Sequence, residues 1–212
     1  ARYCIMDVVN LIEEFADRIP IQEIKSLRRS FPSGNSIVDI LYLMDTEDES
    51  TPRALMKSAS FRELERRTQE EGAPPEYLRE QNQRICVRLV SRELFERHGW
   101  PYYFPLETAW DIIRESHGRG GYIYYREGTE TIRFAYEIDC GISGPNRYDW
   151  TAERRREVLR RVAHAEIGMS TEQYYADIHE GEAAIYIRSR QHTLPPNPRP
   201  PKRPWWRLIL PG

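Results

Sequence analysis

The segment GGYIYYREGTETIRFAYEID, residues 120–139, decides the fold class. Two strand-like runs, 122–127 and 132–138, flank a turn at residues 128 and 129. In the second run, large apolar residues alternate with polar or small ones, which is the period of a strand with one buried face. The segment therefore predicts an antiparallel β-hairpin, and the rest of the chain is interpreted around it.

On the C-terminal side of this hairpin, the pattern changes to that of helices and one further strand. Residues 151–167 have an apolar helical face and are followed by Gly168, which favours a helix with a glycine cap. Ser170 and Gln173 have the spacing of a capping box, so a short helix is expected there. Residues 183–188 contain the strand-prone run AIYI and are predicted to add a third strand to the hairpin.

On the N-terminal side, apolar residues recur every three to four positions, which is typical of amphipathic helices. We expect helices over residues 5–15, 21–31, 36–44, 51–72, 76–98 and 106–113. A strand remains an alternative over 36–44, and Gly99 is expected to cap the long helix over 76–98. The predicted fold is α+β: mainly helical over 1–117, then a small antiparallel hairpin sheet with flanking helices over 118–192.

Composition places the chain among folded proteins. With 40% hydrophobic and 30% charged residues, its 212 residues can bury a core and do not match a disordered chain. We therefore predict one globular domain over 1–192 and an extended, proline-rich arm over 193–212.

Cysteine usage and the N-terminal residues bear on the compartment. Cys4, Cys86 and Cys140 are widely spaced and odd in number, which argues against a disulfide framework and against a cysteine-based zinc site. Acidic residues interrupt the N-terminal apolar run, and no later run has the length of a membrane span. A cytoplasmic, reducing compartment and no membrane contact are expected.

The C-terminal arm differs from the body in charge and in residue type. From residue 183 onwards there are six basic residues and no acidic one, so a total of −2 leaves −8 for the rest of the chain. Seven prolines in the last eighteen residues favour polyproline II, which loses little entropy on docking. The expected partner-binding residues of the arm are Arg203, Trp205, Trp206, Arg207, Leu208, Ile209 and Leu210. The arm can dock on a protein partner or on its own body, and the sequence leaves both open.

A second aromatic block, WPYYF at residues 100–104, lies between two prolines. Aromatic side chains are frequent anchors at protein interfaces. We therefore include Trp100, Tyr102 and Tyr103 among the partner-binding residues.

Histidine and glutamate side chains supply the weak catalytic candidates. His164 and Glu166 have the H-x-E spacing of zinc nucleobase deaminases, but no cysteine follows Cys140, so the second half of that site is missing. His179 and Glu182 add an imidazole and a carboxylate, the groups that a metal-dependent hydrolase or nuclease requires. Cys140 is a further candidate, as a nucleophile. The spacing of none of these matches a metal motif, so no metal site is predicted.

Two glycine-bearing turns and one arginine run complete the set of motifs. Residues 118–121 and 141–144 match neither a phosphate loop nor a dinucleotide fingerprint, so no cofactor is predicted. Arg154, Arg155, Arg160 and Arg161 form a basic stripe on one predicted helix, which is a weak nucleic-acid candidate. Ion pairs with neighbouring glutamates are the alternative, and we favour it.

The sequence therefore predicts a non-catalytic interaction or assembly subunit that uses its C-terminal arm as a docking clasp. A metal-dependent hydrolase or nuclease of effector or defence type is the first alternative, and a nucleic-acid-binding protein is the second.

Overall fold

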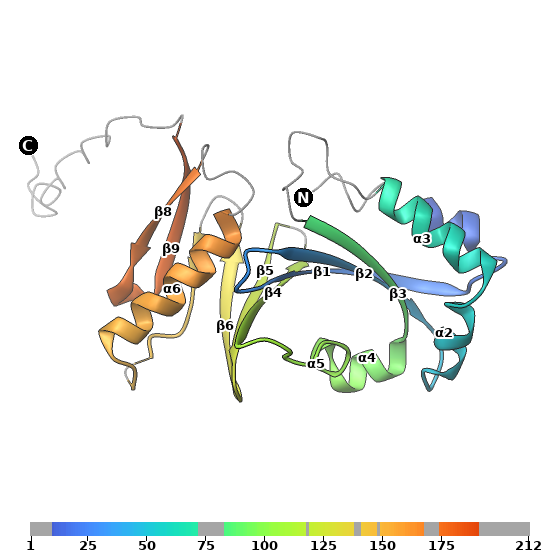
Figure 1. Cartoon of the computed structure of the whole chain (residues 1–212), viewed down its shortest axis with the longest axis horizontal. Helices are drawn as coiled ribbons and strands as arrows, with labels where there is room; N and C mark the ends of the chain where they lie inside the picture. The colour runs from blue at the N-terminus through green and yellow to red at the C-terminus, as the bar shows by residue number, and fades with distance from the viewer. Residues whose placement is uncertain are drawn as a thin grey trace, which may run out of the picture.

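The computed structural model describes residues 10–71, 83–117, 119–137, 141–147, 149–167 and 174–190. Within these residues, nine strands form one mixed sheet in the order β3-β2-β1-β4-β5-β6-β7-β9-β8 (Figure 1). The strands are β1 (Ile21–Ser30), β2 (Ser36–Met44), β3 (Gln83–Ser91), β4 (Trp110–His117), β5 (Gly120–Glu127), β6 (Glu130–Glu137), β7 (Gly141–Ser143), β8 (Tyr174–His179) and β9 (Ala184–Ser189). The helices are α2 (Ser50–Leu55), α3 (Ala59–Glu71), α4 (Arg92–His98), α5 (Trp100–Tyr103) and α6 (Ala152–Ile167), with a 3-10 turn, η2 (Glu180–Glu182).

Strand pairing is antiparallel throughout the sheet except between β2 and β3. The parallel pair needs a crossover connection, and α2 and α3 lie in the segment that joins the two strands. Of the antiparallel neighbours, five pairs follow one another along the chain: β1–β2, β4–β5, β5–β6, β6–β7 and β8–β9. The pairs β1–β4 and β7–β9 join strands that are not consecutive.

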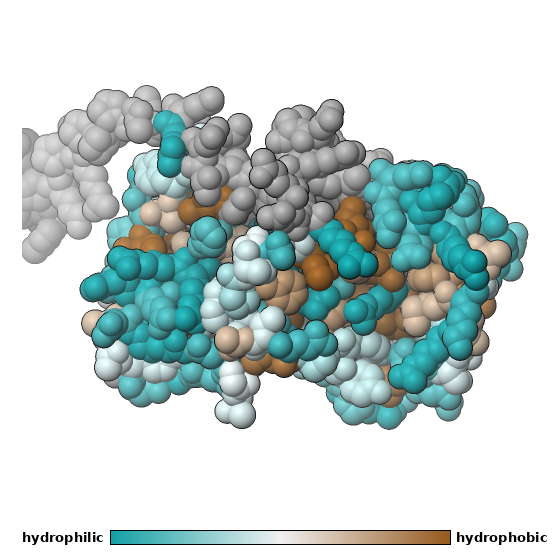
Figure 2. Space-filling model, in the orientation of Figure 1, coloured by the Kyte–Doolittle hydropathy of each residue, from teal (hydrophilic) through white to brown (hydrophobic). Residues whose placement is uncertain are grey.

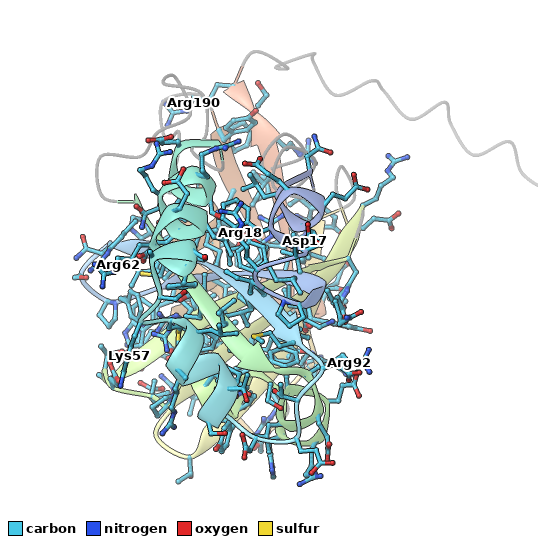
Figure 3. The ribbon with its side chains drawn as sticks, turned by 90° about the vertical axis from the view of Figure 1, so that its right-hand side faces the viewer. Asp17, Arg18, Lys57, Arg62, Arg92 and Arg190 are labelled. Carbon is cyan, nitrogen blue, oxygen red and sulfur yellow. The ribbon has the colours of Figure 1, made fainter. Side chains whose placement is uncertain are left out.

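The two faces of the sheet carry different helices. In Figure 1, α3 lies above β1–β3 and α4 and α5 lie below them, whereas α6 lies beside β6 and β9. We call the two sides the α3/α6 face and the α4/α5 face. The two ends of the side shown in Figure 2, over α3 and over α6, are mainly hydrophilic, and apolar residues gather between them. At the α2–α4 end, Lys57, Arg62 and Arg92 lie on the outside of the molecule (Figure 3).

Three hydrophobic clusters fill the space between sheet and helices. On the α3/α6 face, one cluster joins β1–β3 to α3 around Tyr42 and Leu64, and a second joins β4–β6 to α6 around Tyr125 and Val162. The third cluster lies on the α4/α5 face, where Trp100, Phe95 and Phe104 cover the middle of the sheet.

The predicted mainly helical N-terminal half and small hairpin sheet are wrong. Residues 21–30, expected to be helical, form β1, and residues 36–44 form β2, the strand alternative. Ile24 packs on the α3/α6 face and Leu27 on the α4/α5 face. Because both faces are covered here, apolar residues occur on both sides and the alternation of a half-buried strand is lost.

The long helix over 76–98 and the helix over 106–113 are also wrong within the described residues. Residues 83–91 form β3 and only 92–98 are helical, and residues 110–117 form β4. Ile85, Val87 and Leu89 alternate toward the α3/α6 face, as a strand requires. Residues 83–91 are extended because β3 pairs with β2, which lies more than forty residues earlier in the chain. The local spacing of apolar residues does not indicate this distant pairing.

Other predictions are confirmed. Residues 120–137 form the β5–β6 hairpin, residues 152–167 form α6, and residues 184–189 form β9, although β7 separates β9 from the hairpin. Helices α2 and α3 occupy the region predicted over 51–72, and residues 10–15 of the first predicted helix are helical. The short helix expected from Ser170 begins outside the described residues, and 174–179 form β8.

No helix among the described residues is both long and apolar enough to cross a membrane. Cys86 is a half-buried free thiol, and Cys4 and Cys140 lie outside the described residues.

Candidate binding surfaces

The aromatic block predicted at residues 100–104 forms a tight turn on the sheet. Gly99 ends α4 with a φ of 68°, a left-handed conformation that favours glycine, and its N–H donates to the Phe95 carbonyl at 2.7 Å. The chain then reverses into α5, which buries Trp100 and Phe104 in the core. We call residues 98–104 the aromatic turn.

Hydrogen bonds hold the aromatic turn from beneath. The Tyr103 hydroxyl donates to Glu49 Oε1 at 2.5 Å, and the same oxygen accepts from the Ser91 backbone N–H at 2.9 Å. The Ser91 hydroxyl caps α4 by accepting from the Leu94 N–H at 3.2 Å. Burial, followed by the hydrogen bond and charge of Glu49, raises the pKa of Tyr103 well above its ordinary value of 10. The hydroxyl therefore stays protonated and serves as a structural donor.

Among the aromatic residues at positions 100–104, Tyr102 is the one that is exposed. It is 52% exposed, the largest fraction among the large hydrophobic residues that the structure describes. Its ring stacks on His98 with centroids 5.2 Å apart and meets the ring of Tyr103 edge-on at 5.0 Å. The prolines at 101 and 105 beside it are exposed as well. The aromatic turn thus presents one large aromatic side chain on a fixed base.

The predicted partner-binding residues therefore have different placements. Trp100 and Tyr103 form the buried and hydrogen-bonded base of the turn, and Tyr102 is its accessible member. The arm residues, Arg203, Trp205, Trp206, Arg207, Leu208, Ile209 and Leu210, lie outside the described residues.

Glu166, a weak catalytic candidate, is held between two arginines at the centre of the α3/α6 face. Its Oε1 accepts from Arg28 Nη2 at 2.5 Å and its Oε2 accepts from Arg114 Nη1 at 2.6 Å. The Arg114 guanidinium also lies 4.2 Å from the ring centre of Tyr136. Burial lowers the pKa of Arg114, but the interactions with Glu166 and Tyr136 outweigh it, and the pKa of Arg114 is raised above its ordinary value. Both oxygens of Glu166 are thus engaged where the end of α6 meets β1 and β4.

The other histidine and glutamate candidates lie apart from Glu166. His164 is exposed near the C-terminal end of α6. His179 precedes the 3-10 turn and Glu182 is its last residue. Arg156 of α6 holds this turn through a 2.6 Å contact with Glu180. The eight residues from 156 to 164 span about 12 Å along a helix. The structure does not bring these side chains to one site.

The remaining catalytic candidates are a possible metal site and the nucleophile Cys140. In the parts of the chain that the structure describes, no three His, Cys, Asp or Glu side chains are close enough to hold a metal ion. Cys140 falls outside those parts.

The arginines of α6 contact the body of the protein. The guanidinium groups of Arg154 and Arg161 lie over aromatic rings: Arg154 over Trp150 and Tyr125, and Arg161 over Tyr125 and Trp110. Arg147, which precedes the helix, also lies over Trp150. Glu127 on β5 pairs with both Arg154 and Arg161. Of the predicted basic stripe, Arg155 donates to the Arg147 carbonyl at 2.9 Å and Arg160 is exposed. Two of the four arginines of the stripe, Arg154 and Arg161, therefore join α6 to the sheet.

A surface that the sequence analysis missed lies on the α4/α5 face, beyond the aromatic turn. Tyr122 and Tyr124 of β5 point to this face, and Arg133 of β6 pairs directly with Tyr124 across the hairpin. The alternation of Ile132, Phe134 and Tyr136 indicates only the buried face of the hairpin. The alternation that identified the hairpin contained this signal, because residues 122, 124 and 133 lie on its other side.

Comparison with known proteins gives no relative: no protein-family model, no curated protein and no solved structure matches this chain.

Proposed function

We propose that this protein is a non-catalytic interaction or assembly subunit that docks on a protein partner through its aromatic turn and its C-terminal arm. The observation that carries the proposal is the exposure of Tyr102 on a turn in which Trp100 and Phe104 are buried and Tyr103 is hydrogen-bonded. An exposed aromatic side chain with a fixed base is a typical anchor at protein interfaces.

The fixed base lowers the entropic cost of docking. The Trp100 ring is buried and lies 5.0 Å from the ring of Tyr124, and Tyr103 is tied to Glu49. The backbone under Tyr102 is therefore ordered before a partner arrives, and only two side-chain torsions must be restricted on binding. A tyrosine ring that enters an apolar pocket, with its hydroxyl at the rim, suits this arrangement.

The arm supports the same proposal from its sequence. It combines a run of prolines with Trp205 and Trp206 and carries basic residues without acidic ones. Such a segment matches extended, low-entropy peptides that lie in aromatic or apolar grooves. The partner surface is accordingly expected to be apolar with an acidic rim.

The test is quantitative affinity capture from the cells that produce the protein. The bait forms are the native chain, Tyr102→Ala, a chain lacking 195–212, and the control Tyr174→Ala. Tyr174 on β8 is also an exposed tyrosine, at 39%, but lies far from the aromatic turn along the sheet.

Loss of an interface anchor costs about 2 kcal/mol, which corresponds to about 30-fold in affinity. We expect one protein that the native chain and Tyr174→Ala retain equally, and that Tyr102→Ala and the shortened chain retain at least about tenfold less. Equal capture by all four forms, with each form folded by circular dichroism, would contradict the proposal.

A further inference from the structure

The uncovered part of the α4/α5 face combines aromatic rings with an arginine that no carboxylate of the described residues pairs with. Tyr122 is 36% exposed, and the guanidinium of Arg133 lies 4.8 Å from its ring centre. Arg133 is exposed and makes no ion pair with any described residue. Arg133 thus differs from Arg154, Arg156 and Arg161 of α6, which form ion pairs with glutamates.

The rings continue along the strands as a row. His117 and Tyr122 have centroids 6.3 Å apart, Tyr122 and Tyr124 are 6.2 Å apart, and Tyr124 adjoins the buried Trp100. The row thus runs from the core at Trp100 outward to the exposed His117, and we call it the aromatic row.

A hollow adjoins the aromatic row beside Arg133. It is open, has a volume of about 440 Å³, and lies over β5, β6 and the segment after β7. Two hydroxyl-bearing residues, Thr131 and Ser143, line it together with Tyr122 and Arg133. Arg147 also lines it, but Glu130 and Asp149 pair with that guanidinium at 2.9 and 3.0 Å. Arg133 is therefore the cation of the hollow that is available to a ligand.

We propose that this face binds single-stranded nucleic acid, with a base stacked on Tyr122 and the adjoining phosphate on Arg133. Proteins bind single strands by stacking bases on aromatic rings of a sheet and by placing arginines along the phosphate backbone. The hydroxyls of the hollow supply hydrogen bonds to sugar or base edges. Because the hollow is open and the aromatic row extends past it, a strand of several nucleotides can lie across β4–β6.

The neighbouring carboxylate does not prevent this arrangement. Glu115 is mostly buried and its two oxygens face Tyr124 at 3.4 Å and His117 at 3.5 Å. Its charge is therefore directed at groups of the aromatic row rather than at a strand lying over Tyr122.

The test measures binding of fluorescein-labelled ten-nucleotide oligo(dT) and oligo(U) by anisotropy, over a series of salt concentrations. We expect Tyr122→Ala to weaken binding about tenfold, the loss of one stacked base, and Tyr122→Phe to retain it. Arg133→Ala is expected to weaken binding and to reduce the slope of log K against log salt by about 0.7, which is one phosphate contact on a single strand. Arg160→Ala, on the exposed side of α6, is the matched control and should leave binding unchanged.

Several results would overturn the proposal. These are the absence of binding by the native chain, binding that survives both Tyr122→Ala and Arg133→Ala, or binding lost on Arg160→Ala. Adenosine monophosphate that binds as tightly as the oligonucleotide would identify a mononucleotide site. That result would contradict the proposed binding of a single-stranded nucleic acid. Because Tyr122 and Arg133 are exposed, circular dichroism and melting temperature should not change in these variants.

Discussion

Glu166→Gln should destabilise the protein strongly, because the buried Glu166 carboxylate bridges Arg28 and Arg114 with its two oxygens. Glutamine has nearly the same shape and keeps one acceptor oxygen, so the change removes charge with little loss of packing. It leaves two guanidinium groups facing each other across the strands β1 and β4, where Arg28 and Arg114 are directly paired.

The magnitude follows from burial. Removing one partner of a buried ion pair costs about 3–5 kcal/mol, because the remaining charge is left without compensation. The side chain of Glu166 is 5% exposed, whereas the side chains of Arg28 and Arg114 are 13% and 21% exposed. Solvent therefore screens part of the charge of the two arginines. We therefore expect about 3 kcal/mol, the lower end of that range.

The assay is urea unfolding at pH 7, followed by tryptophan fluorescence. With a slope of about 2 kcal/mol per molar urea, the midpoint should fall by about 1.5 M. Glu63→Gln is the matched control: Glu63 pairs with Arg66 at 2.6 Å on the exposed surface of α3, where solvent screens the pair, and its loss should leave the urea midpoint nearly unchanged. Replacing all three buried charges together, Arg28→Met, Arg114→Met and Glu166→Leu, should recover most of the loss.

A midpoint for Glu166→Gln within about 0.3 M of the native protein would refute this reasoning. That result would mean that Glu166 is not needed to balance the two arginines, and it would return Glu166 to the set of residues free for chemistry.

Three further perturbations test other parts of the structure. A methyl group at residue 121 would lie 2.0 Å from the Glu115 carbonyl oxygen, so Gly121→Ala should cost more than about 2 kcal/mol and lower the melting temperature by roughly 4–8 °C in scanning calorimetry. Arg161→Ala removes contacts with the sheet and should lower stability by about 1–2 kcal/mol in urea unfolding, whereas Arg160→Ala should change it by less than about 0.5 kcal/mol; equal effects would contradict the structural role of the stripe. Because the folded pKa of Tyr103 is raised, its contribution to stability is complete below about pH 10 and is lost as the pH rises further, so Tyr103→Phe should flatten the fall of the urea midpoint above pH 10.

Strong local signals were sufficient for part of the fold. The alternation over 132–137 and the turn at Gly128 specify the β5–β6 hairpin, because one of its faces is buried and the other is open. The apolar face around Val158 and Val162 specifies α6 for the same reason. Gly99 was identified as a cap because a helix end requires a residue that tolerates positive φ.

Local signals failed where partners are distant in sequence. Ile21, Ile24 and Leu27 have helical spacing, yet β1 is extended because β2 and β4 pair with its two edges. Spacing between apolar residues cannot distinguish a short helix from a strand that is covered on both faces. The parallel pairing of β3 with β2 depends on a crossover, which no local pattern shows.

For the candidate site residues, the sequence likewise indicates some positions but not their roles. Residue type alone drew attention to Glu166 and to the arginines of α6, but their roles depend on neighbours that only the fold supplies. The exposure of Tyr102 depends on the burial of Trp100 beside it, which likewise follows from tertiary packing. The surface on Tyr122 and Arg133 could have been found from the sequence by following both sides of the hairpin.

The most direct measurement of the proposed docking role is photo-crosslinking in the cells that produce the protein, with p-benzoylphenylalanine at position 102 or, as the control, at position 174. Both positions are exposed tyrosines in the native chain. The account predicts one discrete protein adduct that forms from position 102 and not from position 174. No adduct from position 102, or the same adducts from both positions, would contradict it.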